Sequence, residues 1–346
     1  MNKKTNKIKF DNNISIKELN KKQICKIIIE KGPISRIDIS KYLNISRPTT
    51  TFYINELIES GLVEETGKSK STPLGGKKAV LLKFNEKAGY ILGVMIGVNN
   101  IRAALTDLNS NILELIKTPT EQWLGPDSVI KKILNNLDYL IKKSGIKKKD
   151  FIGIGIGATG LIDSNLGTVI FSPNLSGWNN IKLKEIIEKK VDLPVIIENE
   201  CRLQAIAEKR FGLAKKYKTF VCIETGTGIG TGVFVGDRLL TGIKGIAGEL
   251  GHLTISIDSG RQCHCGNAGC LESLCSTRSL IEDIILDFKK DKKAGILDYK
   301  NIKVEDLSKL YKEGNAVVVK NVNKNARFLG IGISNAIKIF SPEIII

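Results

Sequence analysis

The sequence predicts a chain of two parts: a small, mainly helical domain at the N-terminus and a larger α/β domain after it. Three observations predict this organisation. The first 85 residues contain apolar residues at helical spacing, bounded by capping residues. From residue 86 onwards, strand-like and helical segments alternate, and glycine-rich turns follow several of the strands. The length of 346 residues is enough for two or three domains with buried cores.

Apolar spacing and a cap mark the first two helices. Residues 1–16 are polar and basic without periodicity, so we expect a disordered basic tail there. Residues 20–30 carry isoleucines at helical spacing, namely Ile24, Ile27 and Ile28. The string "KGP" ends this helix. Ser35 then precedes "RIDISKYL", with Asp38 three residues later, a pattern that predicts a capped second helix.

A third helix follows a tight turn and leads into two strands. Ser46 is its expected cap, Pro48 lies near its start, and Gly61 is expected to end it. We expect four of its apolar residues to be buried: Phe52, Ile54, Leu57 and Ile58. The strings "LVEETG" and "AVLLKFN" predict strands joined by the basic loop "KSKSTPLGGKK". Residues 17–85 are therefore predicted to form a winged helix-turn-helix.

This arrangement favours DNA binding, because the second helix of such a pair can lie in the major groove with its first turn against base edges. Residues 1–85 carry 17 Lys and Arg against 8 Asp and Glu, which also favours DNA. The alternative is a small helical domain that binds another protein. The expected DNA contacts are Ser46, Arg47, Pro48, Thr49, Thr50, Thr51 and Tyr53 in the helix, and Lys68, Lys70, Lys77 and Lys78 in the wing.

The larger domain is predicted from alternating segments. Two strand-like runs flank Gly97, and "DSVIKKILNNLDYLIKKSG" predicts a helix. The string "FIGIGIGATGLID" predicts a buried strand that runs into a glycine-rich turn. A further strand, "LPVIIENE", precedes the helix "CRLQAIAEKRFG", and "KTFVCIETGTGIGTGVFVGDRLL" predicts a hairpin. These segments indicate an α/β domain with ligand-type turns at strand ends.

A metal site is predicted where both histidines of the chain and three of its seven cysteines gather, within residues 248–270. Three thiolates and one imidazole complete a tetrahedral zinc shell, and four protein ligands leave no open position for water. We therefore expect one structural zinc per chain, with His264 turned away from it and Cys275 as a spare ligand. The alternative is a cluster of reduced cysteines without metal. The expected ligands are His252, Cys263, Cys265 and Cys270.

The composition also limits the compartment. No apolar run approaches the length of a membrane span, so no membrane partner is expected. The N-terminus lacks the apolar core of a signal peptide, so we expect a cytoplasmic protein. Seven cysteines in such a chain favour metal binding over a disulfide framework.

The chain resembles the ROK family of repressors and sugar kinases, and within it the xylose-repressor-like and N-acetylglucosamine-repressor-like members. The strings that carry the resemblance include "SPNLSGW", "IENE", "GTGIGTG", "GELGH" and "CHCGNAGCLE", and it covers residues 18–346. It implies a two-lobed, actin/hexokinase-like (RNase H-like) domain after the winged helix, with a small lobe at 86–195 and a large lobe with the zinc site at 196–346. Relatives continue past "IFSPEIII" with a glycine-rich turn and a closing helix, so we expect a chain truncated at residue 346. The alternative is a member of the family that lacks this closing element.

The resemblance implies a sugar site as well. By motif, Gly160 in "GATG" is a weaker candidate for the cleft, and His252 would serve both metal and sugar. The residues implied to contact sugar are Asn174, Asn199, Glu200, Glu249, His252 and Glu272. The expected partners are operator DNA, a monosaccharide or sugar-phosphate effector such as xylose, and a second copy of the chain in a homodimer or a dimer of dimers.

Two departures from the family's kinases predict that the domain is not an enzyme. Met95 stands where these kinases carry an aspartate in the first phosphate loop, and a thioether cannot help to position Mg²⁺. Glu200 stands where their general-base aspartate would be. We therefore expect a sugar-responsive repressor without catalysis. The alternatives are an active ATP-dependent hexose kinase with an appended DNA-binding domain, and a zinc-stabilised interaction protein.

Overall fold

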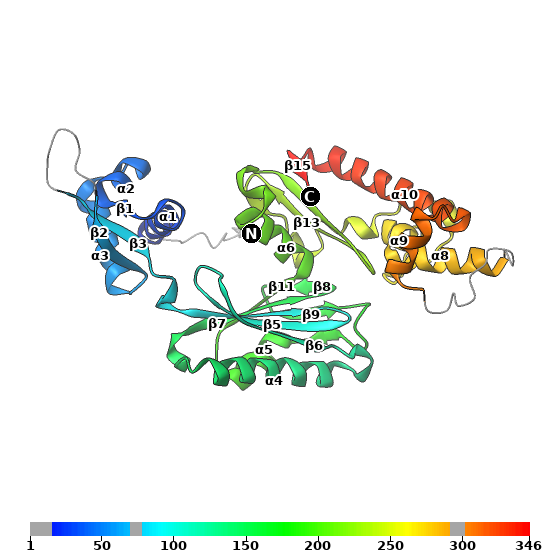
Figure 1. The fold of residues 1–346 in the computed structure, drawn as a ribbon, viewed down its shortest axis with the longest axis horizontal. Helices are drawn as coiled ribbons and strands as arrows, with labels where there is room; N and C mark the ends of the chain where they lie inside the picture. The colour runs from blue at the N-terminus through cyan, green and yellow to red at the C-terminus, as the bar shows by residue number, and fades with distance from the viewer. Residues whose placement is uncertain (1–15, 70–77, 291–301) are drawn as a thin grey trace, which may run out of the picture. The chain divides into compact units, whose positions relative to one another are not determined.

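The computed structural model describes residues 16–69, 78–290 and 302–346 (Figure 1). The chain divides into two compact units. The first runs to Ile91 and also contains Leu105–Leu113 and Ile146–Ile152. The second contains Leu92–Ala104, Glu114–Gly145 and Gly153–Ile346.

The first unit contains the predicted winged helix-turn-helix. Its three helices are α1 (Ile16–Lys31), α2 (Arg36–Leu43) and α3 (Arg47–Glu59). A three-stranded sheet of order β1-β3-β2 completes it, with β1 at Ile34–Ser35, β2 at Val63–Lys68 and β3 at Val80–Phe84. The first helix begins four residues before the predicted stretch. Both predicted caps are confirmed, because Ser35 accepts a bond from the Asp38 amide and Ser46 one from the Thr49 amide, each at 3.2 Å.

An aliphatic core holds these elements together. It includes Ile24, Ile28, Ile34, Ile39, Ile54, Leu57, Val63 and Leu82. The predicted burial of Ile54 and Leu57 is confirmed, and Ile58 packs partly against the same core. Phe52 was expected to be buried, but its side chain is 55% exposed. The reason is helical geometry: Phe52 lies two positions, or about 200° of rotation, from buried Ile54 and therefore faces solvent.

Five strands of the α/β region form one sheet of order β11-β7-β4-β5-β6. Helices α4 (Pro126–Ser144) and α5 (Leu183–Val191) lie side by side next to it in Figure 1 and bury their apolar faces. A small sheet of order β10-β9-β8 adjoins it. The strands are β4 (Tyr90–Ile96), β5 (Asn100–Asp107), β6 (Ile112–Pro119), β7 (Phe151–Ala158), β8 (Leu161–Asp163), β9 (Thr168–Phe171), β10 (Asn179–Ile181) and β11 (Val195–Asn199).

A second sheet of order β14-β13-β12-β15 follows. The predicted hairpin is confirmed, since β12 (Phe220–Thr225) pairs antiparallel with β13 (Ile229–Val235). The short strands β14 (Arg238–Leu239) and β15 (Ile344–Ile345) flank it, and β15 runs parallel to β12. Helix α6 (Glu200–Arg210) packs on this sheet over a small apolar cluster, in which the rings of Phe220 and Phe234 stack at 4.8 Å.

Four helices complete the second unit. They are α7 (Leu271–Cys275), α8 (Thr277–Lys290), α9 (Val304–Lys312) and the long α10 (Ala316–Phe340). Gly332 lets α10 lie close to α7, because a Cβ there would be 2.4 Å from the Leu271 side chain. Within residues 16–69, 78–290 and 302–346, no helix has both the length and the apolar character needed to cross a bilayer. The predicted domain and lobe boundaries stay predictions.

Candidate functional site

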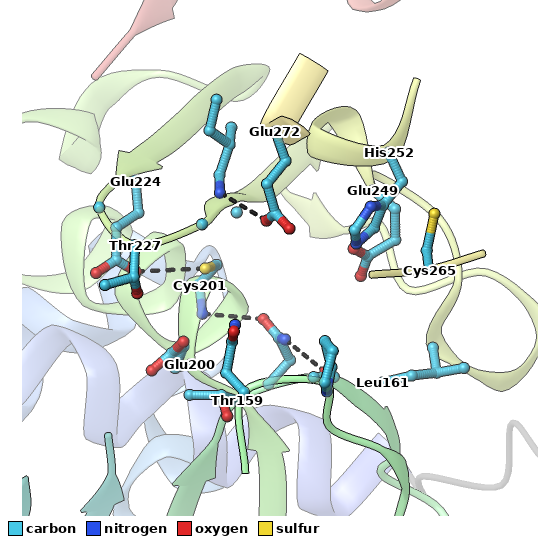
Figure 2. A pocket seen from close by; sticks show the side chains of 18 of the residues that line it. Thr159, Leu161, Glu200, Cys201, Glu224, Thr227, Glu249, His252, Cys265 and Glu272 are labelled. Atoms are coloured by element: carbon cyan, nitrogen blue, oxygen red, sulfur yellow. Dashed lines mark hydrogen bonds between the residues drawn. The ribbon is translucent and has the colours of Figure 1, made fainter. Parts of the chain in front are cut away.

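The second unit contains a cavity of about 410 Å³, within the size range of small-molecule sites (Figure 2). Its walls come from the turn after β7, the segment after β9, the start of α6, the β12–β13 hairpin and the loop that leads to α7. Segments more than a hundred residues apart therefore meet around one space. Gly160 lines the cavity. So do all the residues that were expected to contact sugar: Asn174, Asn199, Glu200, Glu249, His252 and Glu272.

Asn199 lies in the wall, but most of its bonding capacity serves the fold. It is the N-cap of α6, and its Oδ1 accepts bonds from the amides of Cys201 at 2.9 Å and Arg202 at 3.2 Å. Its Nδ2 donates to the carbonyl of Gly160 at 2.9 Å. One amide hydrogen of Asn199 is left for a ligand. The side chain thus fixes both the helix start and the neighbouring glycine turn.

Glu200 begins α6 at the edge of the cavity. Burial, assisted by the nearby charge of Glu224, raises the pKa of Glu200 to about 7. The group can therefore exchange a proton near neutral pH. A protonated carboxyl donates one hydrogen bond and a carboxylate only accepts, so Glu200 can bind a hydroxyl in either sense.

Two further carboxylates face the space from the other side. Burial raises the pKa of Glu249, and the neighbouring His252 opposes this rise. Glu272 is fixed by a hydrogen bond from the amide of Ile229 to its Oε2, at 2.9 Å. Figure 2 shows Glu249 beside His252, with Glu272 reaching towards the hairpin. These acceptors are spaced around a cavity that also has apolar walls, as polyhydroxyl ligands require.

Glu224 is a lining residue that the sequence analysis missed. Its Oε2 accepts a bond from Gln204 Nε2 at 2.8 Å and from the Cys201 thiol at 3.4 Å. One ligand atom each from Glu200, Cys201 and Glu224 lie within 4.8 Å of one another. The available signal was a carboxylate in the apolar run "FVCIET", immediately before the glycine-rich turn.

Met95 lies on β4, next to Gly157 of the adjacent strand β7. Its thioether packs over Gly157 of β7, since a Cβ on that glycine would be 2.6 Å from the sulfur. Leu203 of α6 contacts the same glycine. Met95 therefore fills space between a strand and a helix as an apolar side chain.

The four predicted metal ligands come together in one cluster. One donor atom each from His252, Cys263, Cys265 and Cys270 lie within 4.8 Å of one another. The Nδ1 of His252 is 3.5 Å from the Cys263 sulfur, and the sulfurs of Cys265 and Cys270 are 3.7 Å apart. Tetrahedral zinc bonds of about 2.3 Å to sulfur and 2.0 Å to nitrogen would separate two sulfurs by about 3.8 Å, and sulfur from nitrogen by about 3.5 Å. The donor set and its spacing therefore fit a metal ion.

Burial and a tight turn shape the surroundings of the cluster. Burial raises the pKa of Cys263, and with its neighbouring thiols raises that of Cys270 to about 12. A bound cation would hold such thiols as thiolates. Gly269, at φ +71°, closes the loop, and a Cβ there would be 1.9 Å from the Ser256 carbonyl oxygen. The loop is thus shaped so that its donors converge.

The remaining histidine and the spare cysteine lie outside the cluster. His264 Nε2 accepts a bond from Arg278 Nη1 at 2.7 Å, and Arg278 Nη2 donates to Asn174 Oδ1 at 2.8 Å. Arg278, at the start of α8, thereby links the loop that carries the cysteine cluster to a wall of the cavity. Cys275 is buried in α7 within an apolar cluster, so it does not act as a spare ligand.

The predicted DNA-contact residues mostly lie at the surface of the first unit. Arg47 is exposed and makes no side-chain hydrogen bond or salt bridge among the described residues. Thr49 and Tyr53 are partly exposed. Lys70 and Lys77 lie outside the described residues. The exposed members of the predicted set are Ser46, Arg47, Pro48, Thr51, Lys68 and Lys78.

Thr50 does not fit the predicted contact set. Its side chain is fully buried, and its hydroxyl donates to the Ser46 carbonyl at 3.0 Å. The residue lies four positions before Ile54 and shares its face of α3, which packs on the core. The prediction that Thr50 contacts DNA was therefore wrong, because consecutive residues of a helix point in different directions.

Two known families match this chain, one at its N-terminal part and one along the rest. Residues 17–64 match the winged helix-turn-helix DNA-binding family, and residues 91–346 match the ROK family. A xylose repressor from Caldicellulosiruptor bescii is 35% identical over 343 residues, which cover 97% of this chain and 84% of the relative.

Solved structures of ROK family proteins are also similar to this chain. A ROK family transcriptional regulator, a homologue of the Escherichia coli MLC protein, superposes with a TM-score of 0.81 at 30% identity. The match covers 95% of this chain and 82% of that one. A ROK family glucokinase from Streptomyces griseus, in complex with glucose and AMPPNP, matches with a TM-score of 0.64 at 29% identity. That match covers 74% of this chain and 82% of the glucokinase.

Proposed function

Since the chain belongs to the ROK family and carries a winged helix-turn-helix ahead of the ROK domain, we propose that it is a sugar-responsive transcriptional repressor. The observation that carries the proposal is the similarity to a repressor along 97% of the chain, through both domains. Residues 17–85 would bind operator DNA, with Arg47 as the principal reader of a base. The cavity of the second unit would bind a monosaccharide, of which xylose is the first to test.

The cavity supports this proposal through its hydrogen-bonding groups. Carboxylates accept bonds from hydroxyl groups, and Glu249 and Glu272 both face the cavity, across from Glu200. Glu200 offers a third group that can donate or accept near neutral pH. Asn174 is oriented by Arg278, which donates to its Oδ1, and would contact the sugar through its Nδ2.

The cluster of His252, Cys263, Cys265 and Cys270 would hold one structural zinc ion. Zinc bound by four protein ligands has no open position for substrate, so it would brace the loop and supply no catalysis. His252 would bind it through Nδ1, the atom that faces Cys263, and its other nitrogen would be free for the cavity.

Phosphoryl transfer is not part of the proposal. The apolar Met95 packs over Gly157 and offers no carboxylate for Mg²⁺. Glu200 is one methylene longer than aspartate, and a misplacement of about 1 Å can reduce a transfer rate on the order of 100-fold. The domain would then bind sugar without modifying it.

Sugar binding must change DNA affinity for the protein to act as a sensor. The sugar can do so only if it binds the DNA-competent and DNA-incompetent shapes with different affinity. A homodimer or a dimer of dimers would place winged helices on paired half-sites, whose spacing a change of shape can alter.

The experiment is fluorescence anisotropy on the DNA upstream of the chain's own coding region, with and without a panel of monosaccharides. We expect specific binding to this DNA, with an affinity that at least one of the sugars changes tenfold or more. DNA binding that no sugar alters would contradict the sensing function, and absence of DNA binding at low salt would favour a protein-binding role. Glu249→Gln should weaken the sugar response while operator affinity without sugar stays unchanged.

A second function, an active hexose kinase, is favoured by one observation. The glycine-rich turn Gly226–Gly228 lines the cavity, and a structurally similar ROK glucokinase binds glucose and AMPPNP. Incubation with ATP, Mg²⁺ and the same sugars decides between the two. Sugar-dependent release of ADP above background would establish the kinase.

A further inference from the structure

The walls of the cavity carry several acidic groups and no basic partner for an anion. Glu200, Glu224, Glu249 and Glu272 line it, and no lysine or arginine does among the described residues. His252 is the single lining residue of basic type, and its Nδ1 faces the cysteine cluster. A ligand therefore meets oxygen acceptors from several directions.

The arginine buried near this site is not available to a ligand. Arg202 forms an ion pair with Glu198 at 2.7 Å and donates to the carbonyls of Gly245 at 3.0 Å and Ile162 at 3.3 Å. Arg278 is likewise occupied by His264 and Asn174. Among the described residues, both of these arginines are therefore engaged with protein groups.

Glu224 is held in place by two donors. Gln204 Nε2 donates to its Oε2 at 2.8 Å, and the Cys201 thiol donates to the same oxygen at 3.4 Å. Glu200 lies within 4.8 Å of it. A second anion brought into this corner would meet like charge at short range, with little water to screen it.

Two amides of the glycine-rich turn are already bonded within the protein. Backbone amides of such turns bind phosphate in many proteins. Here the Ile229 amide is already bonded to the Glu272 carboxylate at 2.9 Å, and the Gly226 amide to the Gly228 carbonyl at 2.9 Å. A carboxylate of the protein itself thus occupies a position at the turn that an anionic ligand would use.

We infer that the cavity takes an uncharged sugar and rejects phosphorylated sugars, and that Glu224 is the main determinant of this selection. The inference rests on the proposed sugar-sensing function and narrows its ligand class. Hydroxyl groups of an uncharged sugar can donate to all four carboxylates. A phosphate group carries a charge of about −1.5 to −2 at pH 7 and would have to lose water beside them.

The test is isothermal titration of the full chain, loaded with zinc, with matched pairs: xylose and xylose 5-phosphate, glucose and glucose 6-phosphate, N-acetylglucosamine and its 6-phosphate. We expect the free sugar of at least one pair to bind and its phosphate to bind at least about 100-fold more weakly. Equal or tighter binding of a phosphate overturns the inference but leaves the sensing function standing. If no member of any pair binds, the sensing function itself fails, and the inference with it.

A charge-neutral variant assigns the role to Glu224. Glu224→Gln should reduce the preference for the free sugar at least tenfold, mainly by strengthening binding of the phosphate. The matched control is Glu185→Gln, an exposed glutamate on α5 outside the cavity, which should leave the preference unchanged. An unchanged preference in a Glu224→Gln protein that melts cooperatively overturns the assignment to this residue. If that variant does not fold, the smaller change Glu224→Asp takes its place. This variant keeps the charge and should preserve the preference for the free sugar. A Glu224→Asp protein without that preference would also overturn the assignment.

Discussion

The winged helix and the cavity are held by contacts that differ greatly in sequence separation. In the winged helix, Ser35 and Ser46 each bond the amide three residues ahead. In the cavity, Glu272 bonds the amide of Ile229, 43 residues away, and Arg278 bonds Asn174, 104 residues away. The first region is thus fixed largely by its own local sequence, whereas the second exists only after distant segments have docked.

This difference makes the two regions sensitive to different events. Contacts of long sequence separation form late and cooperatively, because the chain between them must first be ordered. A ligand or a metal bound at such a junction acts on several segments at once. We therefore expect the cavity to respond to metal, pH and sugar, and the winged helix to respond mainly to DNA.

Removal of the metal should give the largest effect and should separate the two regions. In Cys265→Ser, zinc content should fall from one per chain to near zero, because one of the four donors is lost. Sugar affinity should fall at least about 100-fold, since both Cys265 and His252 line the cavity. Operator affinity without sugar should stay near the wild-type value, because the winged helix has its own core. Elemental analysis, calorimetry and anisotropy measure the three quantities.

The control for this prediction is Cys275→Ala. That thiol is buried in α7 outside the donor cluster, so the variant should keep one zinc and lose about 1 kcal/mol of stability. A Cys265→Ser protein that retains full zinc, or a chelator-treated wild type that binds sugar normally, would contradict the assignment.

Glu200 should give the second effect, a pH dependence confined to the cavity. The pKa of Glu200 is about 7 in the folded protein, against about 4.3 for an exposed glutamate. Between these values the folded state holds the proton more tightly than the unfolded state, so the contribution of this group to stability is lost as pH rises from about 4.3 to 7. Glu200→Gln should therefore stabilise the protein at pH 8, by up to about 3 kcal/mol, and leave it unchanged at pH 4.

Thermal melts of wild type, Glu200→Gln and Glu185→Gln without ligand check this expectation. The exposed Glu185 should show no difference from wild type at either pH. A gain in melting temperature for Glu200→Gln that is equal at both pH values would show that packing, not charge, is responsible.

The sequence predicts the winged helix, which local contacts hold, better than the cavity, which distant segments form. Local signals such as caps, turns and alternation predict three features of the fold. They are the N-termini of two helices at Ser35 and Ser46, the two wing strands, and the β12–β13 hairpin. The direction of single side chains within a helix is harder. Phe52 and Thr50 were assigned to opposite environments from those observed, since neither a phenyl ring nor a hydroxyl reveals which face of α3 meets the core.

The cavity was predicted only where a motif marked its residues. The histidine and cysteine spacing gave the donor cluster, and family motifs gave the six lining residues, all without any account of how they meet. Glu224 and the bond from Arg278 to Asn174 were missed, because each depends on a partner many residues away. Such pairs are set by tertiary docking, which a local pattern does not contain.

Arg47 should give the third effect and tests whether α3 reads DNA. Arg47→Ala should lower operator affinity by about 1–3 kcal/mol without changing the melting temperature, because this side chain is exposed and unpaired among the described residues. Thr50→Val is the converse variant. It removes the buried bond to Ser46 and should cost about 1 kcal/mol of stability while operator affinity stays unchanged. Anisotropy and thermal melts distinguish the two, and unchanged operator affinity in Arg47→Ala would remove that residue from the interface.

The smallest expected effect separates the capping role of Ser46 from a contact with DNA. Its Oγ already accepts the Thr49 amide at 3.2 Å and lies 2.7 Å from the Thr49 hydroxyl, so capping is its main role. Ser46→Ala should therefore cost about 1 kcal/mol of stability, as should Ser35→Ala at the preceding helix. Ser46→Asp should restore the melting temperature, because aspartate also caps, yet weaken operator binding by placing a carboxylate near phosphates. If Ser46→Asp binds the operator as well as wild type does, the start of α3 does not approach the DNA backbone.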